Sequence, residues 1–437
     1  MLHHIAIIGS GPSGLFCADA LLRQRPDLKI DVFDRLPTPY GLIRFGVAPD
    51  HQGTKAVTRQ FDRLFGGGSL RFIGNVAVGA DLPLGRLSEH YDAVVLALGA
   101  HADRALGIPG EDLPGRYGSM AFVGWYNGHP DFRHLDPLLD APGIAVIGMG
   151  NVAVDIVRVL GKTPAEMTAS DLCVHAAEVI AAAPVTDLYI IGRRGPAEAS
   201  FTSAELAELG RLERVRPIVE KADLPDGLPS GIDPAEAKIK EKNLQILHDF
   251  AARTDDRPVK LHFLFHSIPE AVLGQSRVEG LKLKGRAAPL SAGTVISAIG
   301  YRTAATGDLP QPNQNGIIPN DNGRVAPGLY VVGWAKRGPS GTIPTNRLEA
   351  KSVADRMLAD FADDTAPAKS GSAALDTWLR QQGLTVIDWP GWKRIEAAEI
   401  AAARQGSPRE KLADWAGLRQ AALPSETQPA APRAGQQ

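Results

Sequence analysis

Short, uninterrupted runs of apolar residues recur along the 437-residue chain and predict buried strands. Two of them, residues 5–8 and 144–147, each lead directly into a glycine-rich turn that is followed by a helical pattern. Two longer runs, 91–100 and 294–301, have the composition of strands in a parallel sheet, where both faces are buried. Apolar runs that alternate with helical segments predict an α/β protein.

The first glycine turn has the spacing of a dinucleotide site. Gly9 allows a tight turn off the strand, Gly11 allows a pyrophosphate to approach, and Gly14 allows the helix to pack closely on the strand. The helix N-terminus then favours the phosphates. A second predicted strand, 29–33, ends at Asp34, whose carboxylate can accept hydrogen bonds from ribose hydroxyls. This order of elements indicates a nucleotide site, although a glycine motif alone would be weak evidence.

The same order returns after residue 144, where two glycines and an alanine open a second helix. The strand that comes next, 188–191, leads to Arg193 and Arg194 in place of an acid. An Arg-Arg pair alone is often a solvated turn, but at this position two guanidinium groups favour a 2′-phosphate over a free hydroxyl. The first unit therefore suits FAD and the second suits NADPH.

Other patterns suggest how the two units are connected. Residues 37–51 are rich in Pro and Gly yet apolar, which predicts an ordered loop over the cofactor. A helix is predicted over 55–65 and a strand over 70–78. The turn-rich segment 109–115 is the predicted crossing into the second domain, and 211–256 is charged and poorly periodic.

The chain then returns to the first domain. A strand is predicted before Trp334, and residues 338–346 open a helix over 347–360, where further backbone amides could face the flavin. A short helical tail comes after it. We therefore expect a discontinuous FAD-binding domain, 1–105 and 324–437, with an inserted NADP-binding domain, 106–323.

Composition is that of an ordinary globular protein, with 44% hydrophobic and 22% charged residues and a formal net charge of −2. Nothing favours nucleic-acid binding. No window approaches the roughly 18 apolar residues of a membrane span, and the first strand follows the N-terminus at once, so we expect a cytoplasmic protein. Cys17 and Cys173 form no C-x-x-C motif, so we expect neither a redox-active disulfide nor a protein-held metal cluster.

Six longer strings are specific: Gly41–His51, Ala121–Gly128, Gly150–Asp155, Gly192–Pro196, Gly333–Pro339 and Pro408–Leu412. At these strings the chain resembles the adrenodoxin reductase family, the NADPH-dependent ferredoxin reductases of bacteria and mitochondria. The resemblance runs over almost the whole chain. It implies a glutathione-reductase-like fold of two Rossmann-like domains, with electrons passing from NADPH through FAD to a one-electron iron–sulfur acceptor of the ferredoxin type.

The resemblance also implies cofactor contacts. FAD would be held noncovalently at Ser13, Asp34, Leu42, Val78, Trp334 and the turn Gly341, Thr342 and Ile343. NADP would be held at Met149, Gly150, Asn151, Val152, Arg193, Arg194, Glu205 and the backbone of Gly341. Asp34 stands where the family usually has a longer glutamate.

His51 is the best polar candidate beside the flavin. A lone histidine is more often structural, but its position in the predicted cofactor loop makes a functional role about as favoured as a structural one. Asp155 and Glu205 are its expected charged neighbours and complete the predicted catalytic group. We expect no covalent nucleophile.

Basic residues gather in the second domain at Arg211, Arg214, Arg216, Lys221, Lys238, Lys240 and Lys242. The resemblance implies that this surface meets an acidic ferredoxin. Glu220 and Glu241 interrupt the run, so a solvated helix of mixed charge is the alternative.

Two other functions stay open. One is an electron-input flavoprotein resembling the small subunit of glutamate synthase, but those proteins carry a cysteine-rich cluster domain that two cysteines cannot form. The other is a non-catalytic, redox-sensing flavoprotein, against which the retention of both nucleotide motifs argues. NADPH-dependent reduction of ferricyanide would distinguish an enzyme from a binding module.

Overall fold

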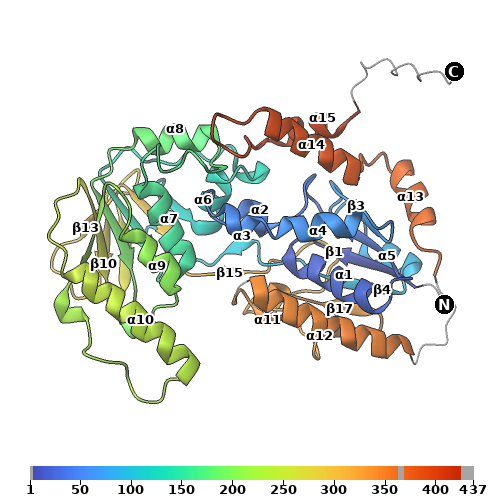
Figure 1. Ribbon diagram of the computed structural model, residues 1–437, viewed down its shortest axis with the longest axis horizontal. Coiled ribbons are helices and arrows are strands. Elements are labelled where there is room, and N and C mark those ends of the chain that lie inside the picture. The colour runs from blue at the N-terminus through green and yellow to red at the C-terminus, as the bar shows by residue number, and fades with distance from the viewer. Residues whose placement is uncertain (1–2, 342, 363–368, 425–437) are drawn as a thin grey trace, which may run out of the picture.

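The computed structural model describes residues 3–341, 343–362 and 369–424, and within them two lobes lie side by side (Figure 1). The first lobe is built on a six-stranded sheet with the order β16-β17-β4-β1-β2-β3. Its neighbours are parallel except for β16 and β17. The strands are β1 (His4–Ile8), β2 (Lys29–Phe33), β3 (Leu70–Ile73), β4 (Ala93–Leu96), β16 (Arg324–Ala326) and β17 (Leu329–Val331).

Helices cover both faces of this sheet. Alternate residues of β1 pack into two separate cores, Ile5 and Ile7 on one face and Ala6 and Ile8 on the other. The long helices α1 and α12 lie against each other (Figure 1). The helices of the lobe are α1 (Pro12–Gln24), α2 (Leu42–Phe45), α3 (Gln52–Lys55), α4 (Thr58–Phe65), α5 (Leu84–His90), α11 (Trp334–Arg337) and α12 (Ile343–Ala362).

The second lobe has a wholly parallel six-stranded sheet with the order β6-β14-β7-β8-β10-β9. Its strands are β6 (Arg116–Gly118), β7 (Gly143–Ile147), β8 (Asp187–Ile191), β9 (Val215–Val219), β10 (Val259–Leu264) and β14 (Thr294–Ser297). A small antiparallel sheet packs beside it, formed by β11 (Pro269–Leu273), β12 (Gly280–Leu283) and β13 (Leu290–Ser291).

The helices of the second lobe connect these parallel strands. They are α6 (Ser119–Tyr126), α7 (Asn151–Gly161), α8 (Val174–Ala182), α9 (Ser203–Leu209), α10 (Pro234–Ala251) and the 3-10 helices η1 (Pro130–Phe132), η2 (Pro196–Glu198) and η3 (Lys221–Asp223). Apolar side chains of β7, β8, α7 and α9 share one core.

The chain crosses between the lobes on two short strands, β5 (Ala102–Asp103) and β15 (Tyr301–Arg302), which pair antiparallel. The predicted crossing at 109–115 is therefore too late in the chain. The carbonyl oxygen of Pro109 already accepts a hydrogen bond from the N–H of Val272 in β11. That of Pro114 accepts one from the N–H of Val278, just before β12.

Three C-terminal helices run along the first lobe towards α8 of the second (Figure 1): α13 (Ser372–Gln381), α14 (Trp389–Ala401) and α15 (Trp415–Ala422). Trp392 and Leu418 are fully buried in the core of the first lobe. Residues 404–412, which join α14 to α15, contact both lobes.

Some predicted elements differ from the structure. The helix predicted over 55–65 is interrupted after Lys55, where hydrogen bonds span three residues instead of four. The strand predicted over 70–78 ends at Ile73, because Asn75 has a φ of +62°, which extended backbone does not adopt, and Gly74 pairs with Ile387 of the C-terminal segment. The helix predicted over 347–360 already begins at Ile343. The segment 211–256 contains the strand β9 and the 18-residue helix α10. No helix in the described part of the chain is long and apolar enough to cross a membrane.

Candidate active site

The first glycine turn lies at the carboxyl end of β1, directly before α1. A Cβ atom at Gly9 would collide with the carbonyl oxygen of Ala97, and one at Gly14 would collide with that of Gly9. Glycine is therefore required at both places by the packing of the chain itself. At Gly11, in contrast, a Cβ atom would meet nothing within 4 Å, and no side chain caps the helix that starts there. Open space before an uncapped helix N-terminus fits a pyrophosphate.

Asp34 lies at the end of β2 and connects two turns. Its Oδ2 accepts hydrogen bonds from the backbone N–H of Ser10 at 2.9 Å and from its hydroxyl at 2.5 Å. Its Oδ1 accepts one from the N–H of Leu36 at 2.9 Å. Each carboxylate oxygen has further capacity to accept. The ribose contact stays a prediction, and the structure adds a role for Asp34 in shaping the turn.

Segments from opposite ends of the chain meet at the start of α1. The hydroxyl of Ser13 lies 3.2 Å from Oδ1 of Asn346 in α12, and Gly333 is so close to Ser13 that a Cβ atom there would collide with the hydroxyl. Trp334 comes directly after Gly333, and its ring lies 6.0 Å from that of Tyr301 in β15. Trp334 is therefore placed where the lobes meet.

The other residues predicted to hold FAD lie at varied depths. Leu42 begins α2 and is half-buried, as is Ile343 at the start of α12. The side chain of Val78 is buried in the core beneath the sheet, so a ligand could contact only its backbone groups. Gly341 is exposed with a φ of +80°. Thr342 lies outside the described residues.

The second glycine turn repeats the geometry of the first. A Cβ atom at Gly148 would collide with the carbonyl oxygen of Ala298, as one at Gly9 would with Ala97. At Gly150 the nearest atom to such a Cβ would be the Ser200 hydroxyl, at 3.2 Å. The helix α7 begins after Gly150 without a side-chain cap. This turn also fits a pyrophosphate.

The residues around this turn are anchored to the loop before α9. The carbonyl oxygen of Met149 accepts from the N–H of Ser200 at 2.8 Å, and Oδ1 of Asn151 accepts from the N–H of Thr202 at 2.8 Å. Val152, in the first turn of α7, is half-buried. The loop and the helix start therefore form one continuous surface.

Arg193 and Arg194 are both exposed just beyond β8. Neither guanidinium group makes a hydrogen bond or an ion pair within the described residues, whereas Arg214 and Arg216 nearby in sequence donate to backbone carbonyls. A cavity of about 630 Å³ opens beside Arg194. Unpaired guanidinium groups next to open space fit a phosphate-bearing ligand.

His51 reaches across the junction between the lobes. Its Nδ1 lies 3.9 Å from Asp155 of α7, and its Nε2 lies 3.6 Å from Glu205 and 3.3 Å from Glu208 of α9. The predicted proximity of His51, Asp155 and Glu205 is confirmed. Glu208 was missed, although its position one helical turn after Glu205 could have indicated it.

These groups alter one another's protonation. The hydrogen bond to Glu208 raises the pKa of His51, and the same bond lowers the pKa of Glu208. Burial, followed by the charge of Asp155, raises the pKa of Glu205 to about 7. The fully buried Arg158 pairs with Asp155 at 2.8 Å and also with Asp50, which compensates the carboxylates. The hydrogen bond to Glu208 therefore favours the protonated form of His51, which burial and the charge of Arg158 oppose.

Comparison with known proteins gives this geometry a context. Residues 7–63 match the NAD(P)-binding Rossmann-like domain. NADPH-ferredoxin reductase FprA of Mycobacterium tuberculosis is 38% identical over 449 residues, which cover 95% of this chain and 98% of that protein. The chain belongs to the NADPH-dependent ferredoxin and adrenodoxin reductase family. Another relative, the human mitochondrial NADPH:adrenodoxin oxidoreductase, is 36% identical over 94% of this chain and 90% of its own length.

Solved structures agree with this family. M. tuberculosis FprA in complex with NADPH has a TM-score of 0.91 and 37% identity, covering 97% of this chain and all of that one. The predicted fold of two Rossmann-like units is confirmed, and this reductase is an oxidoreductase.

Proposed function

We propose that this reductase passes electrons from NADPH through FAD to a ferredoxin-type iron–sulfur protein. The observation that carries the proposal is the pair of uncapped glycine turns, of which one is followed by Asp34 and the other by the unpaired Arg193 and Arg194. FAD, when bound, supplies the exchange between a two-electron donor and a one-electron acceptor.

The residues divide between the two cofactors. For FAD we propose Gly9, Gly11, Ser13, Gly14, Asp34, Leu42, Val78, Trp334, Gly341, Thr342 and Ile343. For NADP we propose Met149, Gly150, Asn151, Val152, Arg193, Arg194, Glu205 and the backbone of Gly341. His51 serves the junction between them.

The role of His51 in this proposal is electrostatic. Its Nε2 lies 3.3 Å from Glu208, and this hydrogen bond raises the pKa of His51, which favours the positively charged ring. Asp155 lies 3.9 Å from Nδ1, and Glu205 lies 3.6 Å from the same Nε2 that contacts Glu208, so acidic groups face both ring nitrogens. The loop of the first lobe thus orients the imidazole against acidic groups of the second lobe, where a charge on the ring would act on bound cofactors.

We propose an FAD-binding domain of residues 1–105 and 324–437 and an NADP-binding domain of 106–323. The two six-stranded sheets support this division. Leu309 and Ile318 lie inside the proposed NADP range but pack in the core of the first lobe, so we propose that the chain returns to that lobe soon after β15, earlier than residue 324.

The proposed ferredoxin surface is narrower than the sequence indicates. Arg214, Arg216 and Lys240 donate to backbone carbonyls of the second lobe. Lys238 and Lys242 are exposed on α10. We propose that these two lysines contribute to the contact with an acidic ferredoxin.

A spectrum of the purified protein before and after anaerobic NADPH tests the cofactors together. A flavin band that bleaches with NADPH, and NADPH-dependent reduction of both ferricyanide and a ferredoxin, are the expected results. A flavin that NADPH does not bleach would overturn the proposed reaction and favour a binding module.

Charge reversal tests the docking surface. Lys238→Glu combined with Lys242→Glu should raise the KM for an acidic ferredoxin about fivefold at low salt and spare that for NADPH, because exposed charges steer association. The effect should fade near 1 M salt, where the Debye length is about 3 Å. The matched control is Lys282→Glu, an exposed lysine of β12. Equal ferredoxin kinetics in the double variant and the control would place docking elsewhere.

A further inference from the structure

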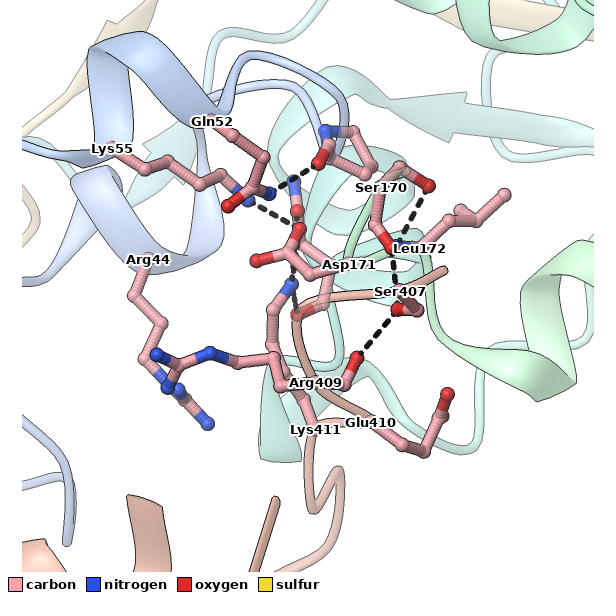
Figure 2. Close-up of polar contacts among 12 residues, drawn as sticks. Arg44, Gln52, Lys55, Ser170, Asp171, Leu172, Ser407, Arg409, Glu410 and Lys411 are labelled. Carbon is pink, nitrogen blue, oxygen red and sulfur yellow. Dashed lines mark hydrogen bonds and ion pairs between the residues drawn. The ribbon is translucent and has the colours of Figure 1, made fainter. Parts of the chain in front are cut away.

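A buried cluster of charges lies where three segments of the chain meet (Figure 2). Nζ of Lys55 lies 2.6 Å from Oδ1 of Asp171, and Nζ of Lys411 lies 3.2 Å from the same oxygen. The side chains of Lys55, Asp171 and Lys411 are 10%, 5% and 0% exposed. Lys55 ends α3 of the first lobe, Asp171 lies after α7 in the second, and Lys411 precedes α15.

Asp171 also holds the other end of the turn that carries His51. The backbone N–H of Asp171 donates to the carbonyl oxygen of Pro49 at 3.0 Å, and the side-chain amide of Gln52 donates to the same oxygen at 2.7 Å (Figure 2). Asp171 of the second lobe therefore binds the first lobe at two points, Pro49 and Lys55. His51 lies between these two points.

A second buried network fixes the segment that supplies Lys411. The guanidinium group of Arg44 and that of Arg409 both bind the carboxylate of Glu399, which is 0% exposed. The N–H of Leu412 donates to the same carboxylate at 3.0 Å. Lys411, between Arg409 and Leu412, is thereby held to the first lobe while its Nζ reaches Asp171.

On the basis of the proposed function, we propose that Asp171 is a positioning residue for His51. The backbone N–H of Asp171 binds Pro49 and its carboxylate binds Lys55, on the two sides of His51 in the sequence. Asp171 thereby sets the distance from the imidazole to Glu205 and Glu208 of the second lobe. Lys411 anchors Asp171 from the opposite side, so that the carboxylate keeps one position.

The electrostatics of the cluster support this role. Burial and the neighbouring Lys411 lower the pKa of Lys55 to about 7, while the carboxylate of Asp171 opposes this fall. Lys55 also faces Arg44, whose charge lowers its pKa further. Without Asp171, Lys55 would lose its proton and release its end of the turn.

The first test measures the imidazole of His51 directly, in the purified protein with the cofactor it retains. Histidine-labelled protein contains 11 histidines, and the His51 signal is assigned by its absence in His51→Gln. Asp171→Asn keeps the N–H that binds Pro49 and removes the carboxylate that binds Lys55. It should lower the measured pKa of His51 by about one unit, because the turn no longer holds the imidazole at hydrogen-bond distance from Glu208. The control Asp140→Asn, which breaks a surface pair with Arg277, should leave it unchanged.

Lys55→Met provides a second variant that leaves the Asp171–Lys411 pair balanced. Lys55→Met should also lower the pKa of His51. If Asp171→Asn does not fold, the measurement is made on Lys55→Met alone. A folded Asp171→Asn or Lys55→Met protein with the His51 pKa of the wild type would overturn the proposal.

The second test is kinetic. Asp171→Asn should lower kcat with ferricyanide about tenfold and change the KM for NADPH less than about twofold. In a His51→Gln background the same substitution should change kcat by less than about twofold, since Asp171 acts through His51. Multiplicative losses would overturn the proposal. If His51→Gln alone leaves kcat unchanged, the proposed role of His51 is wrong, and the pKa measurement decides the positioning independently.

Discussion

The two glycine turns of this reductase share one backbone design but differ in the side chains that lie beyond the next strand. Gly9 packs against the carbonyl of Ala97 as Gly148 packs against that of Ala298, and both helices begin uncapped. At the end of the next strand, the carboxylate of Asp34 accepts hydrogen bonds from the N–H groups of Ser10 and Leu36. The guanidinium group of Arg193, at the equivalent place, makes no hydrogen bond within the described residues. The two turns therefore share one backbone geometry that fits a pyrophosphate, and they differ in the charge of the side chains that follow the second strand.

The surroundings of the turns differ as well. Ser13 at the first turn packs against Gly333 and Asn346, which arrive from the far end of the sequence. The second turn lies next to the cavity beside Arg194. The first turn is therefore built from both ends of the chain, whereas the second borders a cavity.

Removing the basic side chains of the second site should have the largest effect. Replacing Arg193 and Arg194 with alanine should raise the KM for NADPH about 100-fold or more, because each charge-assisted hydrogen bond contributes roughly 1.5–3 kcal/mol. The KM for NADH should stay nearly unchanged. Steady-state kinetics with both coenzymes provide the measurement. Equal losses for NADPH and NADH would show that the pair is structural.

The glycines of the first turn can be separated by their surroundings. Gly14→Ala should destabilise the flavin-free protein by about 2–3 kcal/mol, because the new methyl group collides with the backbone of Gly9. Gly11→Ala faces open space and should change its stability by less than about 1 kcal/mol while flavin retention falls severalfold. Denaturant unfolding and flavin content per chain measure the two effects. A large loss of stability in Gly11→Ala would contradict this assignment.

The acid of the first site should have a smaller effect. Asp34→Asn keeps an oxygen that can accept from Ser10 but removes the charge, so flavin affinity should fall about tenfold. Titration of the flavin-free protein with FAD measures this affinity. Asp27→Asn, which alters a surface pair with Arg25, is the control. Unchanged flavin affinity would leave Asp34 only its role in the turn.

The smallest effect concerns stability and pH. The pKa of Glu205 is about 7 in the folded protein against an ordinary value of 4.5, so the folded state retains a proton that the unfolded state releases. Stability from this group is therefore lost as pH rises from 4.5 to 7. Glu205→Gln should raise Tm at pH 8 by about 1–2 °C and leave it unchanged at pH 4. An equal shift at both pH values would exclude titration as the cause.

Much of this architecture could be predicted because its signals are local. The apolar runs and glycine spacings fall within single βαβ units, where strand, turn and helix are adjacent in sequence. The helix α10 was missed because its buried residues, Asn243, Leu244, Leu247 and Phe250, all lie in its second half. Contacts over long separations left no local pattern, as with Lys55 and Asp171, which are 116 residues apart.

The paired strands β5 and β15 have a consequence for how such reductases can diversify. Asp103 and Tyr301 are partners in the ladder, so the chain enters and leaves the second lobe at neighbouring points. A second lobe that enters and leaves at neighbouring points can be replaced as one inserted domain, and the two segments of the first lobe stay together. Recombination at these two strands would exchange the whole second lobe in one event and leave the first lobe intact.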